Sequence, residues 1–275
     1  MKAVPENVKE HRASLAKLAD ICRSDIFNSA LRAHSSVVGE GFRVNVPVSW
    51  QGNATTSPRL LTAPPSPVCD ILGGVKVVDK IQLIMDIRDK ISIMIIGGGI
   101  AFTFIKEAGV EIGASLYDEN GANLVLEIKH KAEDQGVELT LPVDFVRSSK
   151  MGEDGEVRSG DLSTGVPEGF QGLDIGPKSI ELNDAAIAKS KTVVRNGPMG
   201  VFEMGAFEAG TKRMMENIAE VTAAGATSVI GGGDTSTVCK EYVTVDKVSH
   251  CSTGDGASLE LWEGLIEIIV WTVAT

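Results

Sequence analysis

Short runs, most of them apolar, each followed within a few residues by glycine, recur along the chain from residue 68 onward. The runs are 68–72, 91–96, 192–194, 227–230 and 247–250, and the segments after them contain GGVK, GGG, RNGPMG, GGGDTS and CSTGDGAS. Runs of this kind are typical of strands that are buried on both faces, as in a parallel sheet. The pattern therefore predicts parallel strands whose carboxyl ends lead into glycine loops.

Helical segments are expected between these strands. Residues 120–135 and 205–224 have helical periodicity, residues 5–21 form an amphipathic pattern, and residues 137–146 are a further strand candidate. Strands that alternate with helices build βαβ units, in which helices cover both faces of the sheet. The predicted fold class is α/β, a three-layer parallel β-sheet flanked by helices, as in Rossmann-like nucleotide-binding domains.

All of these glycine loops would lie at the carboxyl edge of the sheet, where parallel α/β sheets bind ligands. Glycine lets the backbone approach a ligand closely, and the helix that follows offers free N–H groups and a partial positive charge. Phosphate suits such a site. One glycine after a strand is often only a tight turn, so the prediction depends on several loops meeting at one edge.

The familiar nucleotide motifs are absent. The chain has no GxxxxGK[ST] motif, and Gly97-Gly98-Gly99 does not complete GxGxxG. Asp118 lies about 20 residues further on, where a dinucleotide-binding fold places the carboxylate for ribose. Because Asp118 falls in a polar turn rather than at a strand end, a dehydrogenase is disfavoured.

Charged residues accompany two of the loops. Lys76 and Lys80 are four residues apart, so on a helix they share one face and suit a phosphate chain. A solvated surface pair is the alternative. Asp234 follows Gly233 in the fourth loop, and a carboxylate beside phosphates suits Mg²⁺. Capping of the helix by Asp234 or Thr235 is the alternative there.

Seven segments, in order along the chain, resemble those of the phosphoglycerate kinase family. They are 71–80 (ILGGVKVVDK), 94–104 (MIIGGGIAFTF), 141–146 (LPVDFV), 172–177 (GLDIGP), 196–203 (NGPMGVFE), 231–235 (GGGDT) and 248–254 (VSHCSTG). The segment LRAHSS at 31–36 resembles the end of that family's amino-terminal domain. The resemblance implies a glycolytic phosphotransferase that transfers a phosphoryl group between 1,3-bisphosphoglycerate and ADP, giving 3-phosphoglycerate and ATP, with Mg²⁺ on the nucleotide.

The resemblance also implies roles for individual residues. Lys76 and Lys80 would stabilise the charge of the transferred group, Arg32 would bind substrate, and Asp234 would serve the metal. The nucleotide-binding residues would be Gly74, Val75, Asp79, Gly98, Gly99, Gly172, Asn196, Gly197, Met199, Phe202, Glu203, Gly232, Gly233 and Thr235. Of these, Gly98, Gly99 and Gly172 would border adenine, and Glu203 would hold the ribose.

The same resemblance predicts four parts of the chain. Residues 1–39 correspond to a remnant of the amino-terminal substrate domain, 40–67 to an atypical proline-rich linker, 68–262 to the nucleotide-binding domain and 263–275 to an atypical tail. The family's second domain would then be largely missing, so turnover by this chain is an open question. The alternatives are a non-catalytic module that binds Mg-ADP or Mg-ATP, or a poorly folded fragment of a faulty gene model.

Charge and cysteine spacing exclude several other classes. A net charge of −11, without a long basic run, disfavours binding to nucleic acid or to an anionic membrane. The four cysteines, at 22, 69, 239 and 251, have neither CxxC nor zinc-finger spacing, so reduced thiols are expected. The polar amino-terminal residues and the short apolar stretches predict a cytoplasmic protein without membrane spans. A monomer is expected.

Overall fold

The computed structural model of the protein describes residues 10, 14, 17–18, 22–23, 44–45, 64–75, 91–152, 154–242 and 244–252. The strands are β1 (Cys22–Arg23), β2 (Val44–Asn45), β3 (Val68–Leu72), β4 (Ile93–Ile96), β5 (Glu138–Thr140), β6 (Asp144–Ser148), β7 (Val157–Asp161), β8 (Gln171–Ile175), β9 (Thr192–Asn196), β10 (Thr227–Gly231) and β11 (His250–Ser252). The helices are α5 (Gly98–Glu107), α6 (Glu119–Asp134), α7 (Pro177–Ala188), α8 (Ala209–Ala223) and α9 (Gly233–Glu241), with 3-10 turns η2 (Gly205–Phe207) and η3 (Val245–Lys247).

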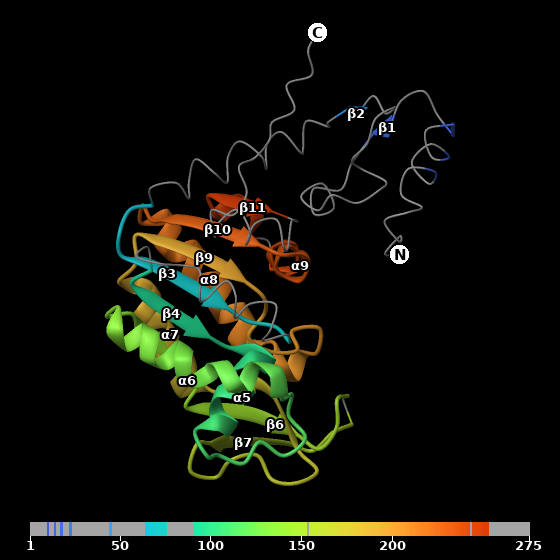
Figure 1. Ribbon diagram of the computed structural model, residues 1–275, viewed down its shortest axis with the longest axis vertical. Helices are drawn as coiled ribbons and strands as arrows, with labels where there is room; N and C mark the ends of the chain where they lie inside the picture. The colour runs from blue at the N-terminus through green and yellow to red at the C-terminus, as the bar shows by residue number, and fades with distance from the viewer. Residues whose placement is uncertain are drawn as a thin grey trace.

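Six parallel strands form the main sheet, in the order β11-β10-β9-β3-β4-β5 (Figure 1). The four predicted strands that precede the first four glycine loops are confirmed within two residues at each end. The fifth is displaced: the prediction was 247–250, but β11 begins at His250. The reason is local, because residues 245–247 form the 3-10 turn η3.

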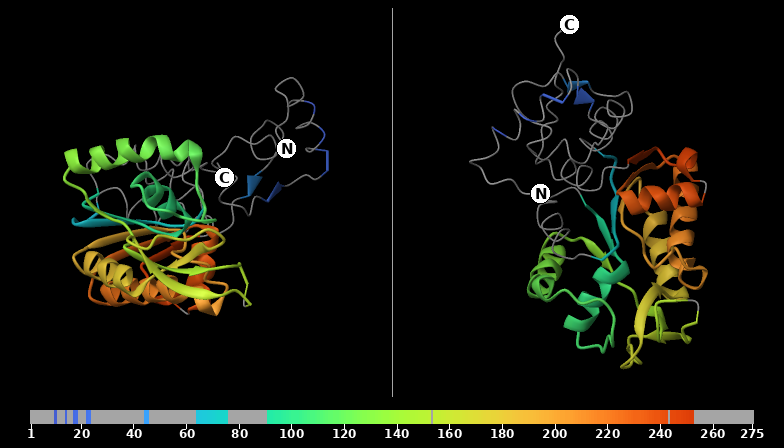
Figure 2. Two further views of the ribbon diagram at one scale, coloured as in Figure 1. Left: turned by 90° about the horizontal axis from the view of Figure 1, so that it is seen from below. Right: turned by 90° about the vertical axis from the view of Figure 1, so that its right-hand side faces the viewer.

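Helices cover both faces of this sheet, which gives the three predicted layers (Figure 2, left). Helices α5 and α6 pack on one face, where their side chains join Leu72, Met94 and Val194 in one core cluster. Helices α7, α8 and α9 pack on the other face with Ile71, Ile95 and Ile230. The α/β fold class is therefore confirmed.

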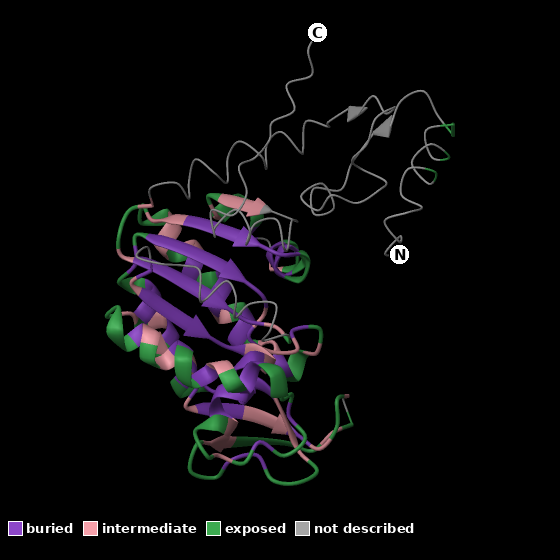
Figure 3. Ribbon diagram, viewed as in Figure 1, coloured by how far each residue is buried: buried purple, intermediate pink, exposed green. Residues whose placement is uncertain are grey.

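The central strands are buried along their whole length (Figure 3). Every residue of β3, β4 and β9 is buried, which explains why their sequences are continuous apolar runs rather than alternating ones. Two charged residues are buried with them: Asp70 on β3 and Arg195 on β9.

The prediction of a single strand at 137–146 was wrong. Two short strands occupy that range, and they belong to different sheets. Strand β5 pairs with β4 in the parallel sheet, whereas β6 lies in the centre of a three-stranded antiparallel sheet, β7-β6-β8. Pro142 lies between them, and since proline has no N–H group to donate, it interrupts a strand.

The two helices predicted at 120–135 and 205–224 are confirmed as α6 and as η2 followed by α8. The predicted helix at 5–21 lies largely outside the described residues, as do most of the segments 1–39, 40–67 and 263–275. Among the helices of the described part, none is long and apolar enough to cross a membrane.

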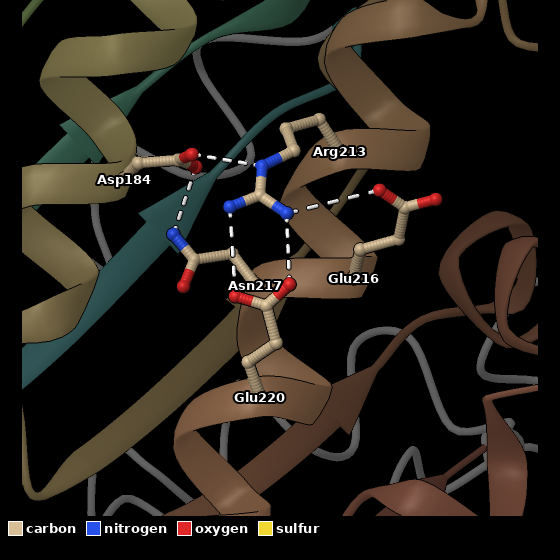
Figure 4. A network of polar contacts seen from close by, with 5 residues as sticks. All are labelled: Asp184, Arg213, Glu216, Asn217 and Glu220. Atoms are coloured by element: carbon tan, nitrogen blue, oxygen red, sulfur yellow. Dashed lines mark hydrogen bonds and ion pairs between the residues drawn. The ribbon is translucent and has the colours of Figure 1, made fainter.

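A polar network joins α7 to α8 on the surface of the second helical layer (Figure 4). Arg213 donates from Nε to Asp184 at 2.8 Å and from Nη1 to Glu220 at 2.9 Å. The amide of Asn217, which is only 4% exposed, donates to the other oxygen of Asp184 at 2.8 Å. Asp184 thus satisfies a buried amide as well as a guanidinium, whereas Glu216 lies 3.8 Å from Arg213.

We expect Asp184→Ala to lower the free energy of unfolding by about 1–3 kcal/mol, because it leaves the buried Asn217 amide without its acceptor. The matched control is Glu216→Ala, which removes only a long, exposed ion pair and should cost less than about 0.5 kcal/mol. Urea unfolding of the two variants measures the difference. Equal losses would contradict this account of the network.

Candidate functional site

The loops at the carboxyl ends of three strands contact one another directly. Four backbone hydrogen bonds join them: Gly73 N to Asn196 O at 2.8 Å, Gly74 N to Pro198 O at 2.9 Å, Gly97 N to Leu72 O at 2.8 Å, and Ile100 N to Gly74 O at 3.1 Å. The loops after β3, β4 and β9 therefore form one continuous surface at one edge of the sheet. This is the convergence on which the phosphate prediction depended.

Gly98 shows how closely these loops approach. Its φ is +62°, and a Cβ atom there would lie 2.5 Å from Gly74 N and 2.8 Å from Pro198 O. Only glycine fits both the conformation and the space. Helix α5 begins at this residue, and no side chain within the described residues caps its amino terminus.

The loop after β10 joins the same edge. Gly232 has a φ of 107° and precedes α9, whose amino terminus also has no side-chain cap among the described residues. Gly197 N donates to Thr235 Oγ1 at 2.7 Å, which ties the first turn of α9 to the loop after β9. Asp234 lies exposed in that first turn. The alternative that Asp234 or Thr235 caps α9 is not what the structure shows.

Apolar groups flank the glycines of α5. A Cβ atom on Gly99 would lie 2.6 Å from Leu116, and one on Gly172 would lie 1.9 Å from the ring of Phe102. Gly172 N donates to Ser115 Oγ at 2.9 Å. Gly172 thus packs against α5, the helix that contains Gly99, and Leu116, which is 49% exposed, lies beside the first turn of this helix.

The sequence of the chain matches one family model, that of phosphoglycerate kinase, over residues 2–265. The chain belongs to the phosphoglycerate kinase family.

Individual relatives agree with this assignment. The chain is 48% identical over 272 residues to phosphoglycerate kinase 2 of Mus musculus, which covers 97% of this chain and 64% of the mouse protein. It is 50% identical over 274 residues to a probable phosphoglycerate kinase of Caenorhabditis elegans, again with 97% and 64% covered. The chain thus spans 64% of the length of these two relatives.

Solved structures of the family have the same fold. Phosphoglycerate kinase from Coxiella burnetii matches with a TM-score of 0.78 and 33% identity, covering 96% of this chain and 68% of the Coxiella chain. The enzyme from Pyrococcus horikoshii OT3 matches with a TM-score of 0.77 and 26% identity, covering 96% and 67%. Identity and structure therefore point to one family.

The family residues predicted from the sequence occupy three kinds of position. Gly74, Gly98, Gly197 and Thr235 belong to the loops joined by hydrogen bonds. Asn196, which is 2% exposed, accepts from Gly73 N through its backbone carbonyl. Val75, Glu203, Gly233 and Asp234 are exposed around this edge. Met199 and Phe202 are 1% and 5% exposed in the core beneath α8, so they support the loop from below.

Four predicted residues cannot be placed. Arg32, Lys76, Asp79 and Lys80 lie outside the described residues. In the described part, no three His, Cys, Asp or Glu side chains come together in a way that could hold a metal ion. A single carboxylate at Asp234 nevertheless fits Mg²⁺ bound to a nucleotide, since that ion takes most of its ligands from phosphates and water.

Asp118 has a structural role in this family member. Its side chain accepts from Asn120 N and Gly121 N, both at 3.1 Å, and so caps α6. The ribose role that a dinucleotide fold would give it is excluded by this position, as the polar sequence around it suggested.

Other residues of the site were missed in the sequence. Pro198 contributes its carbonyl oxygen, which any residue could do, so its type gives no signal. Thr211, at the start of α8, accepts from Met199 N at 3.0 Å and from Gly200 N at 3.1 Å. Asp174 accepts from Gly210 N at 2.8 Å and lies against Gly200. Thr211 and Asp174 hold the loop after β9 in place, and only the fold reveals it.

Burial raises the pKa of Asp174 to about 7; the Gly210 and Ile175 N–H groups lower it, and Glu208 nearby adds to the rise. Its Oδ1 atom has no hydrogen-bond partner within the described residues. The carboxyl group is therefore protonated in the folded protein over a pH range in which an unfolded aspartate, with a pKa of about 4, is ionised.

This difference makes the stability of the protein depend on pH. The folded state binds the extra proton, so the contribution is fully present below about pH 4 and is lost as pH rises through about 7. We expect Asp174→Asn, which stays neutral and can still accept from Gly210, to remove about 2–4 kcal/mol of this decline in the free energy of unfolding. Urea unfolding at pH 4.5, 6 and 8 measures it.

The control is Asp246→Asn, at an exposed carboxylate in η3. Its decline between these pH values should equal that of the unmodified protein. If Asp174→Asn also kept the full decline, Asp174 would not be the group that titrates.

Proposed function

We propose that the converged loops bind Mg-ADP or Mg-ATP, and that this site serves phosphoryl transfer between 1,3-bisphosphoglycerate and ADP, giving 3-phosphoglycerate and ATP. The observation that carries the proposal is the pair of helices, α5 and α9, which begin at the same sheet edge without side-chain caps in the described residues. In α5, Ile100 N is occupied by Gly74 O; the other first-turn N–H groups of the two helices, with the positive partial charge of a helix amino terminus, suit the phosphates of a nucleotide.

Different residues around this edge would contact the phosphates, the metal, the base and the ribose of the nucleotide. The N–H groups at Gly233 and Thr235 would donate to phosphate oxygens, and Asp234 would hold the metal. Gly99, Gly172 and Leu116 offer a surface of low polarity for the base, next to α5. Glu203, exposed on the loop after β9, would accept from the ribose hydroxyls. When bound, Mg²⁺ would neutralise charge on the phosphates.

The transfer itself needs positioning and charge neutralisation more than a covalent nucleophile. Lys76 and Lys80 would supply cationic groups to the transferred phosphoryl group, and Arg32 would bind the phosphoglycerate. This assignment rests on the family resemblance of residues 71–80 and 31–36. The same resemblance supports a monomeric protein acting in glycolysis in the cytoplasm.

Calorimetric titration with ADP, with and without Mg²⁺, tests the binding step. We expect Asp234→Ala to weaken Mg-ADP binding about 10- to 100-fold, because the metal loses its protein oxygen, while Mg-free ADP binding changes little. Asp246→Ala is the matched control, because Asp246 precedes β11 and so lies toward the opposite edge of the sheet. Absence of heat with ADP in the unmodified chain would overturn the proposal.

A second assay separates transfer from binding. The chain is incubated with 1,3-bisphosphoglycerate and Mg-ADP, and ATP is measured by a coupled reaction. ATP formation that Lys76→Met abolishes would support the whole proposal. Nucleotide binding without ATP formation would instead support a nucleotide-binding module that does not turn over.

A further inference from the structure

Two cysteines and one buried arginine meet on the second face of the sheet, away from the proposed nucleotide site. Arg195 on β9 pairs in register with Ile230 on β10, and Ile230 pairs in turn with Cys251 on β11. Residues that pair in register point to the same face. The three side chains therefore form one row across the sheet, beneath α9.

Helix α9 adds the second thiol to this row. Cys239 is fully buried in the same core cluster as Ile230, and the partly buried Cys251 packs against that cluster. Both cysteines are free thiols. The thiol of Cys251 donates a hydrogen bond to the sulfur of Cys239, which joins the last turns of α9 to the edge strand.

The arginine gives this pair an unusual electrostatic environment. The side chain of Arg195 is 0% exposed, and its three nitrogens have no hydrogen-bond acceptor in the part of the chain that the structure describes. Burial lowers its pKa to about 10, while Cys239 and Tyr242 nearby act in the opposite direction. A buried cation without a partner is costly, so an anion beside it is stabilised.

The pKa values of the two thiols are shifted in opposite directions. The hydrogen bond from Cys251 lowers the pKa of Cys239, burial opposes it, and Arg195 and Thr244 lower it further. The same hydrogen bond and burial raise the pKa of Cys251, against a small effect of Lys240. Cys69 is a useful contrast: it is buried beside Asp70, without an arginine, and its pKa is raised. The first proton to leave the pair therefore comes from Cys239.

We infer that Cys239 and Cys251 are a modification site, which forms a reversible intramolecular disulfide by exchange with low-molecular-weight disulfides. The inference rests on the row of side chains and on the contact between the two thiols. It is independent of the nucleotide proposal, since neither cysteine belongs to the converged loops.

The exchange balances without any further reactant. Cys251, the more exposed thiol, attacks the external disulfide R–S–S–R while its proton passes along the hydrogen bond to the Cys239 thiolate. One R–S⁻ leaves and takes up a proton from solvent. The Cys239 thiol then loses its proton to solvent, and the resulting thiolate attacks the Cys251 sulfur of the mixed disulfide; the second R–S⁻ leaves and takes up a proton from solvent. The two cysteines are oxidised by two electrons, and the external disulfide is reduced to two thiols.

Redox titration of the full chain tests this inference. The reduced protein is equilibrated without oxygen in mixtures of reduced and oxidised glutathione, quenched with acid, alkylated, and examined by intact mass and peptide mapping. We expect a species that has lost two hydrogens, in which the peptides of Cys239 and Cys251 are linked, and which dithiothreitol reverses. Closing this loop should also raise the melting temperature by roughly 3–10 °C.

Variants assign the roles of the two thiols. In Cys239→Ser, the thiol that resolves the intermediate is missing, so glutathione should stay attached to Cys251. In Cys251→Ser, Cys239 should stay unmodified, because it is fully buried. Cys22→Ser keeps the pair and is the control that should behave like the unmodified chain. Thermal unfolding followed by circular dichroism confirms that each variant is folded.

The variant Arg195→Met tests whether the buried cation promotes disulfide formation by the cysteine pair. It removes the cation from the core without a large change in volume, so the variant should fold, and disulfide formation at pH 7 should slow about tenfold, the effect of one pKa unit on the thiolate fraction. The inference is overturned if Cys239 and Cys251 both remain reduced, or if the only disulfides formed involve Cys22 or Cys69.

Discussion

A parallel sheet places the carboxyl ends of all its strands at one edge, and the loops that leave this edge must satisfy their backbone polar groups there. In this protein they do so mainly with one another. The N–H groups of Gly73 and Gly74 donate to the loop after β9, and the carbonyl of Gly74 accepts from α5. Because the donors and acceptors are backbone atoms of rigid elements, the edge is pre-organised before any ligand arrives.

Among its described strands, the same sheet buries one charged residue on each face. Asp70 lies in the row of Met94, Val194 and Val229, which faces α5 and α6, whereas Arg195 lies in the row of Ile71 and Ile230, which faces α7 to α9. Buried charges cost several kcal/mol unless a partner compensates them. The thiol of Cys239 on α9 lies near Arg195, and the cation contributes to the lowered pKa of that thiol.

The sequence was sufficient to predict those strands and loops that a local residue pattern marks. Apolar runs followed by glycines located β3, β4, β9 and β10, and the glycine pattern predicted the edge where they converge. It was insufficient where tertiary pairing decides: nothing local separates β5 from β6 except Pro142, and the start of β11 depends on η3. The carbonyl of Pro198 and the hydroxyl of Thr211 are also essential to the edge, but they act through atoms or positions that carry no pattern.

Comparison of the helix amino termini separates structural from functional uses of the same backbone geometry. Helix α6 begins with Asp118, whose carboxylate occupies two backbone N–H groups, so this terminus is already satisfied by the chain itself. Helices α5 and α9 begin with glycine instead, and in the described residues no side chain takes that place. An aspartate or serine there would stabilise each helix by about 1 kcal/mol. Leaving that stabilisation unused keeps first-turn N–H groups other than that of Ile100 free of side-chain partners at the edge where the four loops meet, which is the arrangement that the proposed nucleotide site requires.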